Sequence, residues 1–462
     1  MKKYVFLVML ASAVNVTFAG PICLHPGNPH YFLFRDRPTI LITSGEHYGA
    51  VINADFDYVK YLDTLASDGL NHTRLFVGPY REIPGAFNIQ GNDLAPMPEK
   101  YIAAWQRSDT PGAFDGLNKF DLTKWNDKFF DRLKDFCRQA GKRGIVIEIN
   151  LFCPYYWEDL WKVSPFNAQN NINGVGKVKF SEVYRMANSD IVAHQTAFTQ
   201  KIVGELNEFD NIYYEVCNEP WVHDVEQAWQ EYIVDRIVET EKRLPFKHLV
   251  SLNVANGMRV VEKPHRGVSI FNFHYAGPPT VVAVNYRLNK PIGFNETGFA
   301  GQNDSTYRIQ AWEFILAGGA LFNNLDYSFS PGCEDGTFRY HRQQPGGGSA
   351  SFRKQLKILK QFIDSFDFTK MRPANGIIKG AHTLNGTAWC LANPGKEYAV
   401  YARGNLEMFL YLDIPAGKYN VEWLNTKTGK IEKTEQVSHK KDLLILKAPR
   451  FEEDIALRIV RI

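Results

Sequence analysis

The stretch that decides the fold is Asn211-Ile-Tyr-Tyr-Glu-Val-Cys-Asn-Glu-Pro220. Its early residues are mostly β-branched or aromatic, as in a strand, and Pro220 ends that strand. Asn218 and Glu219 therefore lie at its carboxyl end. A second stretch, Pro291-Ile-Gly-Phe-Asn-Glu-Thr-Gly298, has the same pattern, because a short apolar run ends in Glu296 with a glycine behind it. The sequence thus predicts two strands that each end in a carboxylate.

Two such carboxylates suit the hydrolysis of a glycosidic bond. One carboxyl group protonates the leaving oxygen, while the other attacks the sugar or activates water. In a (β/α)8 barrel the carboxyl ends of all strands meet at one face, so Glu219 and Glu296 would both lie on that face. The interval between them leaves room for one helix, two further βα units and another strand. This spacing fits two strands of one such barrel.

The motifs Asn218-Glu219-Pro220 and Glu296-Thr297-Gly298 resemble the strand-four and strand-seven signatures of a known family. This family is clan A of the retaining (β/α)8 glycoside hydrolases, which contains cellulases and β-mannanases. The resemblance covers about residues 36–365 and implies that Glu219 is the acid/base and Glu296 the nucleophile. Residues 125–176 also resemble a poorly characterised group of bacterial secreted glycosidase-like proteins.

The length of 462 residues suits a barrel of about 250 to 350 residues followed by a smaller domain. After about Phe368, short alternating runs such as Tyr398-Ala-Val-Tyr401 are separated by turn residues, which is typical of an antiparallel β-sandwich. We expect an α/β fold in which a (β/α)8 TIM barrel with an N-terminal hairpin, residues 20–367, precedes a small β-sandwich, residues 368–462. For the second domain, packing against the barrel is favoured over sugar binding.

Residues 1–19 are typical of a signal peptide. Lys2 and Lys3 precede an apolar run that is too short to span a bilayer, and the stretch ends in a small-x-Ala site. We therefore expect an exported protein, periplasmic or extracellular in a bacterium. The stretch Gly20-Pro21-Ile22-Cys23 departs from a lipoprotein box, so lipidation is not expected, and no later stretch predicts a membrane span.

The composition gives no sign of nucleic acid as a partner, because the formal charge is only +3. The chain has no His-Glu-x-x-His motif, phosphate loop or dinucleotide fingerprint, so we expect neither a metal nor a cofactor. Aromatic residues make up 14% of the chain, which fits either sugar-stacking surfaces or a bulky core. A carbohydrate is the expected partner.

Four residues around the glutamates are candidates for roles that the resemblance implies. Arg74, on predicted strand two, should hydrogen-bond Glu296, and a guanidinium there would lower the pKa of that carboxyl. Asn218 would contact the 2-hydroxyl of the sugar. His274 and Tyr275 match a His-x-Tyr pattern on strand six only loosely, since here the two are adjacent. Either could stand beside the nucleophile, and Tyr275 is preferred.

Other polar and aromatic residues are candidates for the pocket, with a structural role as the alternative for each. Six lie at or near predicted strand ends: His47, Tyr48, Glu148, Asn150, Asp326 and Tyr327. A tryptophan that is frequent at the end of strand eight in cellulases is missing, and Tyr327 could take its place. Two long aperiodic loops, residues 78–123 and 152–186, should arch over the catalytic face. Within them, Trp105 and Trp157 could stack on sugar rings or fix the loops to the barrel.

Three alternatives remain open from the sequence. The first is a barrel glycosidase that cuts branched pectic or host glycans from the chain end, because the two long loops could wall a cleft into a pocket. The second is a non-catalytic carbohydrate-binding protein on a barrel scaffold, since a fold does not determine function. The third is an adhesin acting through the β-sandwich. The presence of both glutamates and Arg74 favours an enzyme.

Overall fold

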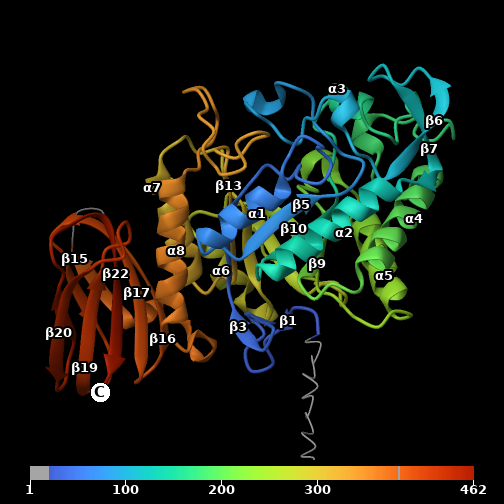
Figure 1. The fold of residues 1–462 in the computed structure, drawn as a ribbon. Helices are drawn as coiled ribbons and strands as arrows, with labels where there is room; N and C mark the ends of the chain where they lie inside the picture. Colours follow the sequence, from blue (N-terminus) through green and yellow to red (C-terminus); the bar gives the residue numbers. More distant parts are fainter. Residues whose placement is uncertain (1–19, 383–385) are drawn as a thin grey trace, which may run out of the picture.

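A computed structural model describes residues 20–382 and 386–462 (Figure 1). The expected signal peptide, residues 1–19, lies outside the described residues. Eight parallel strands form the main sheet, in the order β4-β13-β12-β11-β10-β9-β8-β5. Their bounds are β4 (Leu41–Gly45), β5 (His72–Phe76), β8 (Val146–Phe152), β9 (Ile212–Cys217), β10 (Val250–Asn256), β11 (Ile270–His274), β12 (Ile292–Glu296) and β13 (Leu321–Leu325). The predicted (β/α)8 barrel is confirmed.

One side chain connects the two end strands of this sheet. The backbone N–H of Ile42 on β4 donates to the Asn71 side-chain oxygen at 2.9 Å, and the Asn71 amide donates to the Ile40 carbonyl at 2.9 Å. The Asn71 backbone N–H donates to the Ile42 carbonyl at 3.3 Å. Asn71 immediately precedes β5, so these bonds close the ring between the first and second strands.

Helices cover the barrel from outside. They are α1 (Tyr58–Ser67), α2 (Asp127–Lys142), α4 (Ser189–Leu206), α5 (Gln227–Glu241), α6 (Thr280–Asn285), α7 (Asp304–Leu316) and α8 (Ala350–Asp364), with a short α3 (Glu158–Lys162) in the loop after β8. In α2, the buried Phe129, Leu133, Phe136 and Ala140 recur at helical spacing and so share one face. The link between β10 and β11, residues 257–269, contains no helix. The expected eightfold alternation is therefore incomplete at the fifth unit.

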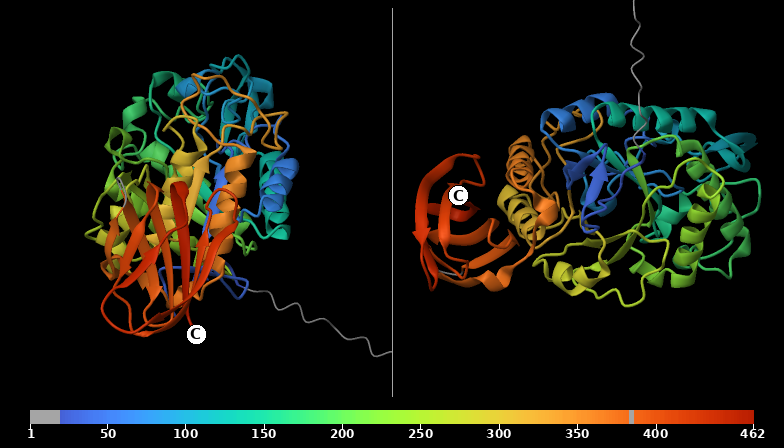
Figure 2. Two further views of the ribbon diagram at one scale, coloured as in Figure 1. Left: turned by 90° about the vertical axis from the view of Figure 1, so that its left-hand side faces the viewer. Right: turned by 90° about the horizontal axis from the view of Figure 1, so that it is seen from below.

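The lower end of the barrel is covered by a three-stranded antiparallel sheet of β1 (Cys23–Leu24), β2 (Phe32–Phe34) and β3 (Arg37–Thr39), seen from below in Figure 2. The predicted N-terminal hairpin is thus confirmed. The Arg35 guanidinium in its turn pairs with Asp210, with 2.6 Å between Nε and Oδ2. The carboxyl ends of the barrel strands form the opposite end of the barrel, where the long loops gather.

The loop expected over residues 78–123 contains a hairpin that the sequence pattern did not predict. It consists of β6 (Trp105–Pro111) and β7 (Asn118–Trp125). Trp105 is 1% exposed, and its ring packs 4.9 Å from Phe166 and 5.2 Å from Phe198 between ring centroids. The expected sugar-stacking role of Trp105 is therefore corrected, because a side chain enclosed in the hydrophobic core presents no face to a sugar.

The C-terminal part forms two antiparallel sheets, β14-β16-β17-β22-β19-β20 and β15-β18-β21, around an apolar core of their own. The bounds are β14 (Arg372–Pro373), β15 (Ile378–His382), β16 (Thr387–Asn393), β17 (Glu397–Leu406), β18 (Phe409–Leu412), β19 (Gly417–Leu424), β20 (Ile431–His439), β21 (Leu444–Lys447) and β22 (Phe451–Arg461). This is the predicted β-sandwich, and in Figure 1 it packs beside α7 and α8.

Side chains from α7 fix the β-sandwich to the barrel. Trp312 stacks on Tyr401 of β17, with ring centroids 5.6 Å apart and an interplanar angle of 16°. Arg308 is buried and forms two bonds of 3.0 Å to the two carboxylate oxygens of Asp454 on β22. An interface with a stacked aromatic pair and a buried ion pair supports the expectation that the two parts form one packed body.

Across the part of the chain that the structure describes, every helix falls short of the length and apolar character needed to cross a bilayer.

Candidate active site

A cavity of about 320 Å³ opens at the carboxyl ends of the barrel strands. Both predicted catalytic glutamates line it. The lining residues are His47, Tyr48, Phe76, Tyr80, Glu82, Phe87, Leu94, Cys153, Tyr156, Asn218, Glu219, Asn256, Tyr275, Glu296, Phe299 and Leu325. Aromatic walls around two carboxylates give a site that can hold a ring-shaped polar molecule through its apolar faces.

Glu296 ends β12, and its carboxylate is fully engaged. The hydroxyl of Tyr48 donates to its Oε2 at 3.0 Å, the hydroxyl of Tyr275 donates to its Oε1 at 3.1 Å, and the guanidinium of Arg74 donates to Oε2 at 3.1 Å. Burial alone would raise the pKa of Glu296, but the charges of His274 and Arg74 outweigh burial and lower it to about 2. Glu296 is therefore ionised at neutral pH.

Glu219 faces Glu296 from the end of β9 and has its own partners. Its Oε1 lies 2.9 Å from Nδ1 of His274, and its Oε2 accepts a bond of 2.7 Å from the hydroxyl of Tyr156. Burial alone would lower the pKa of His274, but the carboxylates of Glu296 and Glu219 outweigh burial and raise it to about 9. His274 is therefore protonated at neutral pH, and its Nδ1 can donate a hydrogen bond to Oε1 of Glu219.

Three pocket residues that follow barrel strands have left-handed backbone conformations, with φ of +68° at Tyr48, +39° at Glu219 and +48° at Tyr275. Each follows closely after a barrel strand. Non-glycine residues adopt this conformation at a cost of order 1 kcal/mol or more, and it persists where the surroundings impose it. Pro220 and the bond of 3.1 Å from the Glu219 backbone N–H to Asn253 Oδ1 fix the turn at Glu219.

Beneath the pocket, Arg74 on β5 is fully buried in the barrel interior. It donates to Asn218 Oδ1 at 2.8 Å and pairs with Glu215 of β9, in addition to Glu296. Nε of Arg74 lies 3.7 Å from a carboxylate oxygen of Glu148. The predicted contact between Arg74 and Glu296 is present in the structure, and Arg74 also positions Asn218, the residue next to the acid/base candidate.

Glu148 and Asn150 on β8 are buried below the pocket and do not line it. Burial raises the pKa of Glu148 well above its usual range, and the neighbouring Glu215 adds to this effect. Burial would also raise the pKa of Glu215, but Arg74 outweighs burial and lowers it. Asn150 donates to Glu215 at 2.6 Å. The expectation that these two residues line the pocket is corrected, because they form the polar interior of the barrel that holds Arg74.

Asp326 and Tyr327 follow β13 but stand behind the pocket wall. Asp326 is buried, accepts a bond of 2.9 Å from Ser44 and pairs with Arg353 of α8 at 2.8 Å. The ring of Tyr327 is 2% exposed and lies 5.9 Å from the ring of His47 between centroids. The expected pocket role of Asp326 is corrected, because its charge is taken up by Arg353. Tyr327 supports the wall from behind.

His47 follows β4 and lines the pocket opposite Glu219. Its Nε2 lies 3.2 Å from both carboxylate oxygens of Glu82. Burial alone would lower the pKa of His47, but the charge of Glu82 outweighs burial and raises it. The hydroxyl of Tyr80 also donates to Glu82, at 3.1 Å. This pair places an imidazole and a carboxyl group on the pocket wall, where sugar hydroxyls can form hydrogen bonds with either.

Trp157 lies outside the cavity lining, at the outer rim. Its ring packs 4.9 Å from Phe87, which does line the cavity. Phe87 in turn packs 5.0 Å from Tyr156 and 6.4 Å from Phe299 between ring centroids. Trp157 therefore supports the rim through Phe87, and direct contact with a sugar stays a prediction.

Four contributing residues were missed from the sequence: Tyr156, Glu215, Asn253 and Glu82. Glu215 carried a usable signal, because it lies two residues before Cys217 and four before Glu219, on the same inward face of a strand. Asn253 lies within β10, so its place on a strand was the available signal. Tyr156 and Glu82 lie in loops whose sequence has no period, so nothing in the pattern directs them to the pocket.

The grouping of Glu219, His274 and Glu296 also has the residue types of a metal site, since one ligand atom from each lies within 4.8 Å of the others. The charges around these three residues favour a protonated His274 over a bound metal ion. Arg74 already contributes a fixed positive charge 3.1 Å from Glu296, and the raised pKa of His274 keeps the imidazole protonated, whereas a metal requires a neutral ring.

Comparison with known proteins gives fold relatives. Residues 88–219 match a family described as "Domain of unknown function (DUF6298)". No curated protein matches. Among solved structures, a candidate glycoside hydrolase from Bacteroides vulgatus ATCC 8482 is similar with a TM-score of 0.65 and 14% identity, covering 96% of this chain and 82% of the other.

Two further structures agree. A glycoside hydrolase family 5 protein from Bacteroides vulgatus ATCC 8482 has a TM-score of 0.64 and 14% identity, with 96% of this chain and 93% of the other covered. A glycoside hydrolase family 5 mannosidase from Rhizomucor miehei has a TM-score of 0.50 and 14% identity, with 75% and 99% covered. At these identities the comparisons establish the fold, so the chain shares its barrel architecture with glycoside hydrolases of known structure.

Proposed function

We propose that this protein is a retaining glycoside hydrolase that cleaves an O-glycosidic bond of an oligo- or polysaccharide by double displacement. Glu296 is the nucleophile and Glu219 the acid/base. The observation that carries this proposal is the pairing, across one pocket, of an ionised, fully hydrogen-bonded Glu296 with a Glu219 whose Oε1 lies 2.9 Å from Nδ1 of His274. The fold shared with glycoside hydrolases supports it.

In the first step, Glu296 attacks the anomeric carbon. The bond from that carbon to the leaving oxygen breaks, its electron pair stays on the oxygen, and the oxygen takes the proton from Glu219. Oε1 of Glu296 is the better candidate for the reacting atom. Oε2 is held by both Arg74 and Tyr48, whereas Oε1 faces Tyr275 and lies 3.3 Å from Nδ1 of His274.

In the second step, water attacks the same carbon and gives a proton to Glu219, and the ester bond to Glu296 breaks. Glu219 thereby regains its proton, and the sugar leaves with its original configuration. Retaining enzymes need the two carboxyl groups about 5 to 5.5 Å apart, whereas inverting enzymes leave about 6.5 to 9.5 Å for a water. Approach of Glu219 and Glu296 oxygens within 4.8 Å supports the retaining arrangement.

The test is a screen of the mature chain on aryl β-glycosides and on plant and host polysaccharides. Glu296→Gln should lose activity on every substrate. Glu219→Ala should lose about 10²- to 10⁴-fold in kcat/KM on poor leaving groups but retain kcat/KM on 2,4-dinitrophenyl glycosides, whose leaving group needs no acid. Its second step should be slow, and azide should accelerate it by attacking in place of water. Asp364→Asn, an exposed carboxylate change on α8, is the matched control. Full activity of Glu296→Gln would refute the proposal.

We also propose export, on the basis of the signal-like residues 1–19. Expression of the full chain in a bacterium should yield, in the periplasm or medium, a protein whose N-terminal residue is Gly20. Retention of the uncleaved chain in the cytoplasm would contradict this proposal.

A further inference from the structure

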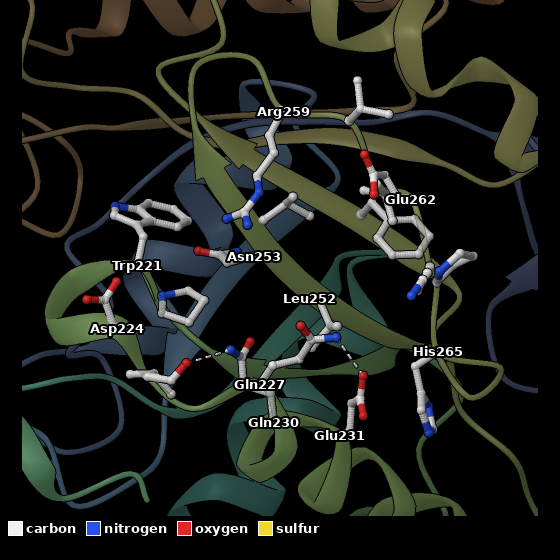
Figure 3. Close-up of a pocket in the computed structure, with 18 residues that line it drawn as sticks. Trp221, Asp224, Gln227, Gln230, Glu231, Leu252, Asn253, Arg259, Glu262 and His265 are labelled. Carbon is white, nitrogen blue, oxygen red and sulfur yellow. Dashed lines mark hydrogen bonds between the residues drawn. The ribbon is translucent and has the colours of Figure 1, made fainter.

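The missing fifth helix leaves a second cavity, a groove of about 740 Å³, on the barrel (Figure 3). One side of the groove is α5 with the turn before it, and the other is the helix-free link that follows β10. Its residues are Pro220, Trp221, Asp224, Val225, Gln227, Gln230, Glu231, Leu252, Asn253, Val254, Arg259, Val260, Val261, Glu262, Lys263, Pro264, His265 and Phe271. In a complete unit, a helix would pack over β10 and fill this space.

The groove walls carry groups suited to a polar chain. Trp221 and Arg259 face each other at its upper end, with Gln227 and Gln230 below them (Figure 3). Within the described residues, the Arg259 guanidinium has neither a hydrogen bond nor an ion-pair partner. An indole face, amides and an unpaired guanidinium are the groups that bind sugar rings and hydroxyls.

The groove begins at the residues that follow the acid/base candidate in the chain. Pro220 and Trp221 follow Glu219 directly, and Asn253, which lines the groove, holds the backbone N–H of Glu219 at 3.1 Å. The edge of Trp221 packs against His274, with ring centroids 5.2 Å apart. Asn256 lines the catalytic pocket, and three residues later Arg259 lines the groove. The linings of the two spaces thus include neighbouring residues on the side of Glu219, the acid/base candidate.

The opposite side of the pocket is closed by three interlocked loops. The rings of Phe87 and Phe299 lie 6.4 Å apart across the mouth, and both line the pocket. Behind them, Asn88 donates to the Gln343 carbonyl at 2.8 Å, and Gln302 donates to the His341 carbonyl at 2.7 Å. These contacts link the loops after β5, β12 and β13, and we call them the loop wall.

The loop wall and the groove lie on opposite sides of the barrel. The loops of the wall follow the second, seventh and eighth strands in chain order, whereas the groove follows the fourth and fifth. In a closed ring of eight, the fourth and fifth positions face the eighth and first. A glycan that enters the pocket is therefore stopped on the side of the wall and continues on the side of Glu219.

We propose that the protein acts at the non-reducing end of a glycan: one terminal sugar occupies the pocket, and the remaining oligosaccharide lies in the groove beside α5. This inference rests on the proposed hydrolase function and adds the mode of attack and a binding site for the leaving group. Phe87 and Phe299 exclude further sugars, while Arg259 and Gln230 bind the leaving part.

The first arm of the test uses three probes that share one terminal sugar, chosen as the sugar whose aryl glycoside the wild type hydrolyses. They are the aryl monoglycoside, a trisaccharide labelled at its reducing end, and the same trisaccharide with a bulky acetal on its non-reducing end. The wild type should release single sugars from the trisaccharide and should cleave the capped probe at least a hundredfold more slowly. Equal cleavage of both trisaccharides would overturn the proposal.

The second arm tests the loop wall and the groove independently, with variants of each. Phe87→Ala combined with Phe299→Ala should raise cleavage of the capped probe at least tenfold, because the barrier is removed. Arg259→Ala with Gln230→Ala should lower, about tenfold, the ratio of kcat/KM on the trisaccharide to that on the monoglycoside, mainly through KM. Arg450→Ala, an exposed arginine on the β-sandwich, is the matched control. An unchanged ratio in the groove variant would refute the binding site.

Failure of this inference and failure of the proposed function give different results. If the wild type cleaves capped and uncapped probes equally, the hydrolase function is supported, and the proposal that the loop wall limits cleavage to the non-reducing end is refuted. If the wild type cleaves no probe and no polysaccharide, the hydrolase function itself fails, and the inference fails with it.

Discussion

At the scale of single residues, the pocket is organised by charge. Arg74 and His274 hold Glu296 ionised, while Glu215 balances Arg74 from below. Two cations and two carboxylates at this depth are tolerable only because each has a partner, since an isolated buried charge costs several kcal/mol. Removing one member should therefore affect both stability and catalysis.

Arg74→Met tests this balance. Methionine fills much of the same volume but leaves Glu215 and Glu296 without their shared cation. We expect the free energy of unfolding to fall by about 3 to 5 kcal/mol, as when one partner of a buried pair is removed. Urea denaturation measures this change. Arg372→Met, at an exposed arginine, is the control and should stay within about 0.5 kcal/mol of the wild type. A change of the same small size in the free energy of unfolding of Arg74→Met would contradict the claim that Arg74 balances the charges of Glu215 and Glu296.

The raised pKa of His274 predicts a pH dependence. The pKa of His274 is raised to about 9 in the folded protein, so the proton is bound below that pH and lost above it. We expect kcat/KM to fall as the pH rises through about 9, and the stability that His274 contributes to fade over the same rise from its ordinary pKa of about 6.5. No acid limb from Glu296 should occur above about pH 3, because its pKa is about 2.

The variant His274→Gln tests the origin of this limb. This variant lacks the imidazole whose pKa is raised to about 9, so its fall in kcat/KM should no longer follow that pKa. Rate profiles against pH, measured for both proteins on the same aryl glycoside, test this prediction. Identical alkaline limbs would mean that His274 is not their origin.

At the scale of elements, the barrel strands position the chemistry through their ends. Several pocket residues come directly after a strand, and Glu219 does so with a φ of +39°. Because glycine adopts this conformation without strain, Glu219→Gly should be more stable than Glu219→Ala by about 1 kcal/mol. Thermal and urea unfolding of the two inactive variants measure the difference. A more stable alanine variant would show that the backbone is not strained at this site.

The elements also explain what the sequence could predict. Buried parallel strands are continuous apolar runs, so Val146–Phe152 and Ile212–Cys217 were recognisable, and with them the position of Glu219. The hairpin of Trp105–Pro111 and Asn118–Trp125 was not, because its exposed strand shows little alternation and Pro111 interrupts the pattern. Its role as a packed cover over the barrel depends on contacts with Phe166 and Phe198, which are distant in sequence.

The candidate site was predictable to a similar extent. Glu219, Glu296 and Arg74 lie on strands, where periodicity fixes the direction of a side chain. Asp326 was misassigned because its partner, Arg353, comes from a helix that periodicity does not place against it. Tyr156 and Glu82 lie on loops, and loop geometry is set by long-range contacts that a single sequence does not reveal.

At the scale of the whole molecule, the β-sandwich packs on α7 through the buried pair of Arg308 and Asp454. Asp454→Ala would leave Arg308 buried without its main partner and should lower the free energy of unfolding by about 3 to 5 kcal/mol. Because this interface lies on the outer side of α7, kcat on an aryl glycoside should stay within twofold of the wild type. A large loss of kcat in correctly folded protein would indicate that the β-sandwich acts on the pocket.

The measurement that tests the central claim most directly is covalent trapping of the nucleophile. The protein is incubated with 2-deoxy-2-fluoro glycosyl fluorides, whose glycosyl-enzyme forms quickly and hydrolyses slowly, and its peptides are analysed by mass spectrometry. The account predicts one label per chain on Glu296, labelling of Glu219→Ala at the same residue, and none in Glu296→Gln. A label on another carboxylate, or an inverted product without any label from a sugar that the protein hydrolyses, would contradict it.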